Sequence, residues 1–243
     1  MNYINPVFKY NNPLFKEAFK KATCILTISV GQEVHEGNKF AATVELVNRS
    51  FAACTLLIDD SLQRHSMALD GSQNADFFYE TSVLAGDLWL ERNKQYYKNL
   101  SILQEIIRWD RWLKHPRYLE QQAQIKSLMA EDGTYQQSFE STVDEFLRRF
   151  YARLSENILD RERARSLCLD YLIEECSAFC LWTELKAEFE VYPNRRSLAL
   201  QATFERFVQP LYPELLYAVS VKFKNRKQFR PQNFHEIKTR GEV

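Results

Sequence analysis

The chain has 243 residues, and its 32 Lys and Arg balance its 32 Asp and Glu, so its formal net charge is zero. A neutral chain has no overall attraction to nucleic acid or to anionic lipid, so only a local group of cations could bind either. No apolar run is long enough to span a bilayer. Residues 1–10 lack a signal-peptide core, and the five cysteines lie in apolar segments, so we expect a cytoplasmic protein in a reducing compartment.

The first part of the chain predicts a strand, a helix and a second strand. After a polar and aromatic lead-in over 1–22, residues 23–32 form a nearly continuous apolar run that Gly31 ends, which predicts a buried strand. A helix is expected over 38–51, capped by Asn38. A second apolar strand, 52–58, ends at Asp59 and Asp60. This order predicts a βαβ unit of a doubly wound parallel sheet.

Helices are expected to dominate the rest of the chain. After a break at 71–74, the periodicity predicts a long helix over 75–113, then helices over 117–130, 135–154, 161–185 and 197–208. The helix over 161–185 is apolar from 167 to 182, so it is expected to be buried. Short strands are expected at 189–194 and 215–223. Residues 224–243 read as a loose basic tail, and the whole chain, 1–243, is expected to form a single domain.

Ser29 lies at the carboxyl end of the first expected strand, where ligands of doubly wound sheets bind. The segment from Thr27 to Gly31 resembles half of the G-x-S-x-G nucleophile elbow, with Thr27 in place of the first glycine. The last histidine is His235, in the tail, so a Ser-His-Asp hydrolase has weak support. From the residues alone, a serine that merely ends a strand and satisfies a turn is the better-supported interpretation.

Two further segments carry candidate polar groups. Tyr171 and Glu175 are four residues apart on a helix that is otherwise apolar, so they share one face. Such a carboxylate needs a partner, either an arginine or a bound cation such as a protonated amine. Tyr192 ends a short strand and is followed by Pro193, which could present its phenol to a cleft.

The sequence predicts neither a metal nor a nucleotide cofactor. Cys176 and Cys180 are four residues apart, but no His or further Cys stands nearby at ligand spacing, so we expect them to pack in the core. No phosphate-binding glycine motif is present.

Ser29 with Gly31, Tyr171 four residues before Glu175, and Tyr192 followed by Pro193 stand in an order and at separations that resemble the tRNA-dependent cyclodipeptide synthases, over residues 23–223. The resemblance implies a monomeric Rossmann-like domain, similar to the catalytic domain of class I tyrosyl- and tryptophanyl-tRNA synthetases but without their ATP-binding motifs. One subgroup has Asn after the nucleophile and Tyr-His later. Gln32 and the Tyr-Pro pair imply the other subgroup.

The resemblance also implies a reaction that belongs to secondary-metabolite biosynthesis. Two aminoacyl-tRNAs would be the substrates, and Ser29 would attack the first ester to form an aminoacyl-enzyme, as in a ping-pong mechanism. Tyr171 and Glu175 would hold the amino group. The amine would attack the second ester, and the dipeptidyl-enzyme would close to a diketopiperazine, with Tyr192 assisting proton transfer. No histidine would be required.

Substrate-binding residues follow from strand alternation and from the resemblance. Ile25, Thr27 and Ser29 should share a face, with Leu56 on the next strand beside them. The resemblance adds Gly31 and Gln32. The expected substrate-binding residues are therefore Ile25, Thr27, Gly31, Gln32 and Leu56. Because Thr27 and Leu56 would narrow the space beside the nucleophile, a small first residue such as Gly or Ala is expected.

A protein that binds tRNA through its phosphates needs a cationic surface. We expect it on the long helix, at Arg92, Lys94, Lys98, Arg108 and Arg111. A cluster that begins at Lys222 and continues into the tail is a second candidate, and solvated surface charge is the alternative for both.

Two other interpretations stay open at this point. One is a serine α/β hydrolase or acyltransferase that acts on small esters through Ser29. The other is a non-catalytic tRNA-binding domain of the same fold. Activity that survives replacement of every histidine would argue against the hydrolase, and an aminoacyl ester on Ser29 would exclude the binding domain.

Overall fold

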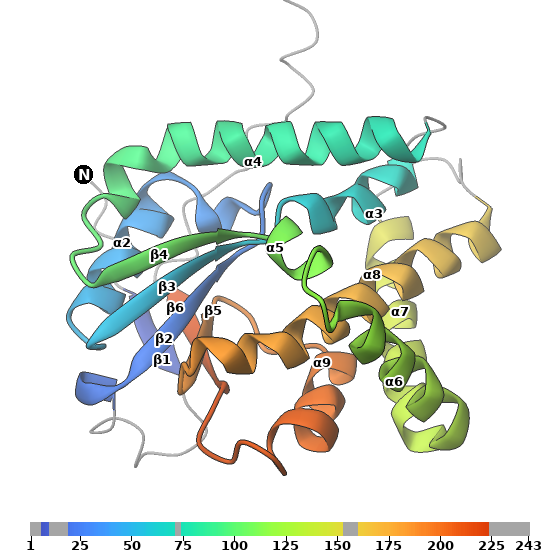
Figure 1. Cartoon of the computed structure of the whole chain (residues 1–243). Helices are drawn as coiled ribbons and strands as arrows, with labels where there is room; N and C mark the ends of the chain where they lie inside the picture. Colours follow the sequence, from blue (N-terminus) through green and yellow to red (C-terminus); the bar gives the residue numbers. More distant parts are fainter. Residues whose placement is uncertain (1–5, 10–18, 71–73, 153–159, 224–243) are drawn as a thin grey trace, which may run out of the picture.

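A computed structural model describes residues 6–9, 19–70, 74–152 and 160–223 (Figure 1). Six strands form one sheet in the order β1-β6-β5-β2-β3-β4. Neighbouring strands are parallel except β1 and β6, which are antiparallel. The strands are β1 Pro6–Lys9, β2 Thr23–Ile28, β3 Ala53–Ile58, β4 Leu103–Arg108, β5 Phe189–Tyr192 and β6 Tyr217–Phe223. The predicted α/β architecture with a mostly parallel sheet is confirmed.

Helices flank this sheet on both faces (Figure 1). The α-helices are α2 Gly37–Asn48, α3 Arg64–Met67, α4 Ala75–Tyr97, α5 Asp110–Leu113, α6 Tyr118–Glu131, α7 Gly133–Tyr151, α8 Arg161–Leu181 and α9 Leu198–Thr203, and α9 continues as a π-helical turn over Phe204–Val208. Short 3-10 turns lie at Phe19–Lys21, Glu33–His35, Ser61–Gln63, Ala68–Asp70 and Trp182–Leu185. None of the helices in the described ranges is long and apolar enough to cross a membrane.

The alternation of side chains along each strand divides the core in two. Leu26, Ile28 and Val191 point to the face that α2 and α4 cover. Ile25 and Leu57 point to the opposite face, where they pack with α6, α7, α8 and α9. Because both faces are covered, the central strands are apolar at successive positions, as the sequence of β2 and β3 predicts.

The order of the strands reverses at β2. The chain runs outward from β2 through β3 to β4, and then crosses back to form β5 on the other side of β2. In sheets of this kind a crevice opens at the carboxyl ends of the two strands that flank the reversal. Ser29 directly follows β2 and Tyr192 ends β5, so both residues lie at this crevice.

Two predicted elements and one predicted helix cap are wrong. The long helix expected over 75–113 ends at Tyr97, and residues 103–108 form the edge strand β4. Leu103 and Ile107 are spaced like a helical face, but the edge position leaves Glu105 and Ile106 exposed to solvent, so the strand lacks an apolar run. The lead-in over 1–22 contains β1, which pairs with β6. Asn38 lies inside α2 rather than at its cap.

Residues 224–243 lie outside the described ranges, so the predicted basic tail is not placed.

Asn74 caps α4, because its side chain accepts a hydrogen bond from the Phe77 amide at 2.8 Å.

Candidate active site

Ser29 stands on a tight turn after β2. The amide of Gln32 donates to the Ser29 carbonyl at 3.2 Å, and Gly31 has φ of +87°, a conformation that favours glycine. The turn therefore stops the strand and leaves the Ser29 side chain at the crevice. Its main-chain nitrogen donates to Nδ1 of His35 at 2.9 Å.

Asp59 accepts a hydrogen bond from Ser29 Oγ at 2.8 Å through Oδ2 and from the Val30 amide at 3.0 Å through Oδ1. It follows β3 directly and is 3% exposed. Burial raises its pKa well above the ordinary range, and the hydrogen bonds from Ser29 and Val30 oppose this. Sequence reasoning missed this residue. The available signal was the pair of carboxylates at the end of the strand beside Ser29.

Tyr192 places its hydroxyl 2.9 Å from Ser29 Oγ. Burial and the nearby Asp59 raise the pKa of this phenol, so it is a proton donor at neutral pH. The loop after Tyr192 is held by Arg196, whose Nε donates to Glu190 at 2.6 Å while its guanidinium lies over the rings of Phe179 and Phe204. Tyr192 thus approaches Ser29 from an anchored segment.

His35 is 1% exposed and supports the nucleophile through the backbone only. Burial lowers its pKa to about 4, so the imidazole is neutral near pH 7 and its Nδ1 can accept from the Ser29 amide. Among the described contacts, the His35 ring makes no hydrogen bond with Ser29 Oγ. Replacing every histidine would therefore disturb the Ser29 turn, which removes the value of that test for separating a hydrolase from other enzymes.

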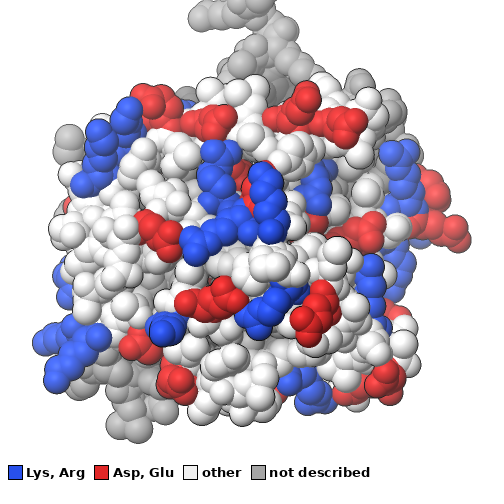
Figure 2. All heavy atoms as spheres, in the orientation of Figure 1, with Lys and Arg blue, Asp and Glu red and all other residues white. Residues whose placement is uncertain are grey.

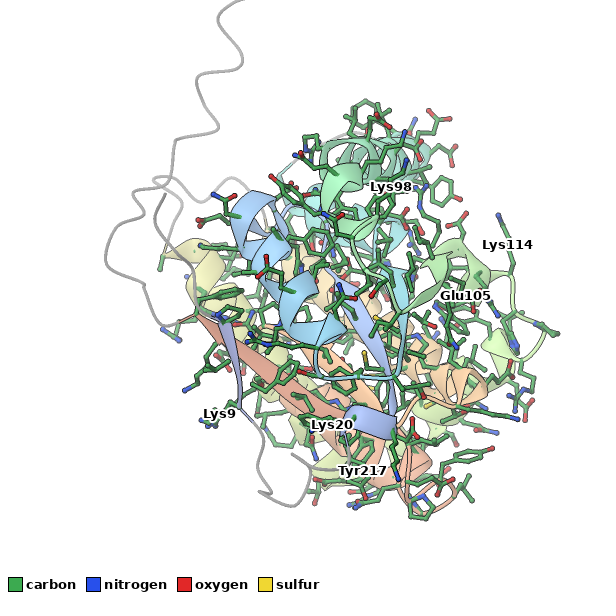
Figure 3. All side chains as sticks on the ribbon, turned by 90° about the vertical axis from the view of Figure 1, so that its left-hand side faces the viewer. Lys9, Lys20, Lys98, Glu105, Lys114 and Tyr217 are labelled. Atoms are coloured by element: carbon green, nitrogen blue, oxygen red, sulfur yellow. The ribbon has the colours of Figure 1, made fainter. Side chains whose placement is uncertain are left out.

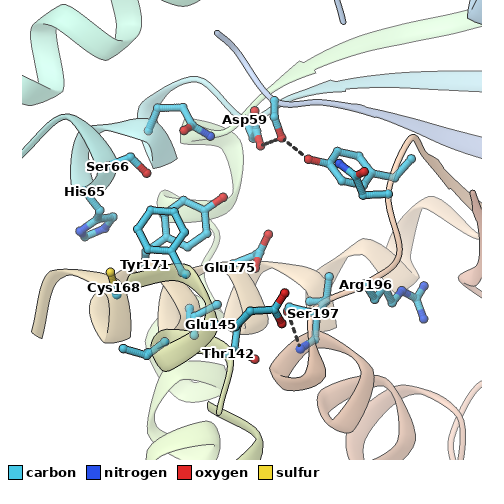
Figure 4. A pocket seen from close by; sticks show the side chains of 18 of the residues that line it. Asp59, His65, Ser66, Thr142, Glu145, Cys168, Tyr171, Glu175, Arg196 and Ser197 are labelled. Atoms are coloured by element: carbon cyan, nitrogen blue, oxygen red, sulfur yellow. Dashed lines mark hydrogen bonds between the residues drawn. The ribbon is translucent and has the colours of Figure 1, made fainter. Parts of the chain in front are cut away.

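Tyr171 and Glu175 lie one turn apart on α8 and line the same cavity as Ser29. Figure 4 shows both side chains in this cavity. Within the described ranges, Glu175 forms no ion pair. Burial, with a smaller effect of Glu190, raises the pKa of Glu175 to about 8. Glu174 points the other way and pairs with Arg64 and His65. An enclosed carboxylate without a cation is suited to bind an ammonium group supplied by a ligand.

The cavity has a volume of about 630 Å³ and lies between the sheet and helices α7, α8 and α9. Figure 4 shows Asp59 above it, facing Tyr171 and Glu175. Thr27, Ser29 and Gln32 line it as well. Thr27 is buried, and its hydroxyl has no hydrogen-bond partner in the described part of the chain.

The structure separates three of the predicted substrate-binding residues from this cavity. Leu56 pairs with Leu26 across the β2–β3 ladder, so it points to the α2 and α4 face and the prediction is wrong. Ile25 packs with Leu57 in the opposite core and does not line the cavity. Gly31 shapes the turn and lies outside the cavity lining.

The predicted tRNA-binding cations do not form one stripe. Arg92, Lys94 and Lys98 belong to α4 or its cap, whereas Arg108 ends β4 and Arg111 lies in α5. Four of them pair with carboxylates of the protein: Arg92 with Glu36, Lys94 with Glu91, Arg108 with Asp60 and Asp87, and Arg111 with Glu105. Figure 2 shows basic and acidic side chains interleaved over this face.

Lys98 has no ion pair among the residues described. It follows α4 at the end where Asn99 meets Asn48, the last residue of α2. That end lies at the amino ends of the strands, the end seen in Figure 3, while Ser29 lies at the carboxyl ends.

No group of three or more His, Cys, Asp or Glu in the described ranges could hold a metal ion.

The fold and the site define a Rossmann-like α/β enzyme with a serine at the crevice and, across the cavity, a carboxylate without an ion-pair partner among the described residues. A cyclodipeptide synthase (CDPS) from Fluoribacter dumoffii shares 41% identity with this chain, and the match covers 91% of this chain and 98% of the other with a TM-score of 0.87. The chain therefore belongs to the cyclodipeptide synthases, which are tRNA-dependent aminoacyltransferases.

More distant structures agree with this fold. A cyclodipeptide synthetase from Mycobacterium tuberculosis, described as related to type I tRNA synthetases, shares 13% identity over 90% of this chain and 94% of its own, with a TM-score of 0.67. A cyclodipeptide synthase from Candidatus Glomeribacter gigasporarum bound to Phe-tRNA shares 18% identity over 88% and 92%, with a TM-score of 0.61. No protein-family model and no curated protein match the sequence.

Proposed function

We propose that this enzyme joins the aminoacyl groups of two aminoacyl-tRNAs into a cyclic dipeptide by a ping-pong mechanism on Ser29. The observation that carries the proposal is the hydrogen-bonded set of Ser29, Asp59 and Tyr192, which faces the unpaired Glu175 across one cavity. A nucleophile and an ammonium site are what an aminoacyl ester requires. The relative bound to Phe-tRNA supports the choice of substrate.

In the first step, Ser29 Oγ attacks the carbonyl carbon of the aminoacyl ester and passes its proton to Asp59 Oδ2. A new ester bond forms on Ser29, the ester bond to the tRNA ribose breaks, and the ribose oxygen takes up the proton. The raised pKa of Asp59 makes it a stronger base than an exposed carboxylate. Because the single hydroxyl proton of Ser29 is donated to Asp59, the Tyr192 hydroxyl is the donor to Ser29 Oγ, and Asp59 remains the acceptor of the serine proton.

In the second step, Tyr171 and Glu175 hold the amino group of the aminoacyl-enzyme. The pKa of Glu175, about 8, lies near that of an α-amino group, so the carboxylate can take a proton from the ammonium and release a nucleophilic amine. The amine attacks the second aminoacyl ester, an amide bond forms, and the second tRNA leaves with a proton on its ribose oxygen.

The third step closes the ring. The free amine of the dipeptidyl group attacks the ester carbonyl on Ser29, a second amide bond forms, and the bond to Ser29 Oγ breaks. Ser29 recovers a proton from the attacking amine, and Tyr192 is the hydroxyl that can relay it. The product is a diketopiperazine and the enzyme returns to its starting state.

Several finer features belong to the same proposal. Gln32 after the nucleophile and Pro193 after Tyr192 support the Tyr-Pro subgroup of the family. Thr27 narrows the cavity beside Ser29, which supports a small first residue such as Gly or Ala, although Leu56 contributes nothing to it. The five cysteines are free thiols, which supports action in a reducing cytoplasm, and the enzyme is proposed to act as a monomer.

The test is mass spectrometry of the medium from bacteria that express the wild-type chain or Ser29→Ala at matched soluble levels. We expect a new cyclic dipeptide containing Gly or Ala only with the wild type. A product that persists in Ser29→Ala would remove Ser29 as the nucleophile. If the wild type hydrolyses aminoacyl-tRNA and releases free amino acid without cyclic product, it is a hydrolase instead. A product with two aromatic residues would refute the small first pocket.

A further inference from the structure

Three cations lie together on the sheet beside Tyr192. In the antiparallel β1–β6 ladder, Lys9 pairs with Ser220, and Lys222 is two residues further along the same strand, so Lys9 and Lys222 point to the same face. The Ser220 hydroxyl donates to the carbonyl of Asn194 at 3.0 Å, which fixes the loop bearing Arg195 against β6. We call Lys9, Arg195 and Lys222 the β-edge cations.

This face is the one that bears the cavity. Phe8, Val221 and Val191 point to the α2 and α4 core, so the residues between them point to the other side, as Tyr192 and Glu190 do. Tyr192 pairs with Ser220, and Ser220 pairs with Lys9, so one row crosses three strands. Two strand spacings place the Cα atoms of Tyr192 and Lys9 about 10 Å apart. Arg195 itself lines the cavity.

None of the β-edge cations forms an ion pair with a described residue, in contrast to four of the five cations predicted to bind tRNA. The positive charge of Arg195, and then that of Lys222, lowers the pKa of Lys9, as expected where like charges stand close together. Arg195 and Lys222 are exposed. Three cations on one surface, without an ion-pair partner among the described residues, favour a ligand with several negative charges. Figure 3 shows Lys9 well apart from Lys98 and Lys114.

We propose that Lys9, Arg195 and Lys222 bind phosphates at the acceptor end of an aminoacyl-tRNA whose ester bond lies at Ser29. This inference rests on the proposed function, because an ester at Ser29 carries its polynucleotide out of the same cavity. The backbone phosphates next to the ester must then pass the cavity mouth, where Arg195 stands. The cations position the substrate and take no part in the bond changes.

The experiment compares wild type with Lys9→Gln/Arg195→Gln/Lys222→Gln. The matched control, Lys20→Gln/Lys21→Gln/Lys126→Gln, removes the same charge from exposed lysines elsewhere, and Lys20 and Lys21 precede β2 at the end opposite to Ser29. Two quantities are measured from 50 to 200 mM salt. The first is the dissociation constant for tRNA that carries no amino acid. The second is the rate of Ser29 acylation, measured once with aminoacyl-tRNA and once with aminoacyl-adenosine, which has no phosphate.

In the β-edge variant we expect roughly tenfold weaker tRNA binding at 50 mM salt and a slope of log K against log salt that is shallower by about 2, at about 0.7 per single-strand phosphate contact. Acylation by aminoacyl-adenosine should be unchanged, and the control variant should match wild type. If the salt slopes of tRNA binding are equal in both variants and in wild type, the inference is overturned. The proposed function still stands in that case, provided that aminoacyl-tRNA acylates Ser29 in the wild type. An equal loss with aminoacyl-adenosine would overturn it too, by showing damage to the cavity. Wild type that neither binds tRNA nor becomes acylated would overturn both.

Discussion

Replacing Asp59 by Asn tests whether this carboxylate is the base for Ser29. The side chain keeps its size, and Oδ1 can still accept from the Val30 amide, which lies 3.0 Å away in the wild type. The change falls on Oδ2, which becomes an NH₂ group that donates toward Ser29 Oγ and cannot take its proton. General-base catalysis contributes about 10²–10⁴-fold, so the barrier should rise by about 3–5 kcal/mol.

The assay is single-turnover acylation of Ser29 by aminoacyl-tRNA, followed by intact-protein mass spectrometry. Stability gives an independent readout. Burial holds the pKa of Asp59 above its unfolded value, so ionisation above the unfolded pKa destabilises the folded state, and this destabilisation is complete once the pH exceeds the folded pKa. Asn cannot ionise, so Asp59→Asn should acylate at least 100-fold more slowly while its melting temperature at pH 8 does not fall.

Asp60→Asn is the matched control. Asp60 is equally buried and adjacent, but it binds Arg108 and the amides of Ser61 and Trp109 rather than Ser29. We expect this variant to lose stability and to keep its acylation rate while folded. If Asp59→Asn acylates Ser29 at the wild-type rate, Asp59 is not the base. If both variants lose rate and stability together, the effect of Asp59 is structural.

Two further predictions concern charge and packing. The pKa of Glu175 is about 8 in the folded state against 4.5 ordinarily, so the folded state loses stability as the pH rises from 4.5 toward 8. Glu175→Gln should therefore melt a few degrees above wild type at pH 8.5 and at the same temperature as wild type at pH 4.5. A constant difference in melting temperature across this range would contradict the raised pKa. Gly86→Ala would place a Cβ 2.5 Å from Asp60 Oδ2, so it should lower the free energy of unfolding by about 1–3 kcal/mol in thermal denaturation, although Ala favours helices. The Cβ of Gly133→Ala meets nothing within 4 Å, so this variant should lose no stability. Equal stability of the two variants would refute the close packing of α4 on Asp60.

The sequence by itself determined the elements whose signal is local. The apolar run over 23–30 encodes a strand buried on both faces, and the glycine that follows permits the turn that exposes Ser29. Tyr171 and Glu175 share a cavity because four residues make about one helical turn. The order of these residues along the chain also carried the resemblance to the family, which the identity to a known member confirms.

Only the tertiary structure decided which distant residues meet. Asp59 and His35 reach Ser29 because β2 pairs with β3 in one particular register and because the turn after β2 folds back, and neither contact leaves a periodic trace in the sequence. The same register turned Leu56 away from the cavity, since a shift of one residue along a strand reverses the face. The edge strands β1 and β4 escaped prediction because a strand with one open side needs no continuous apolar run. The sequence shows where cations occur, but only the fold shows which of them have partners. Arg108 is paired with Asp60. In contrast, the β-edge cations Lys9, Arg195 and Lys222 lie together without a carboxylate partner in the described ranges.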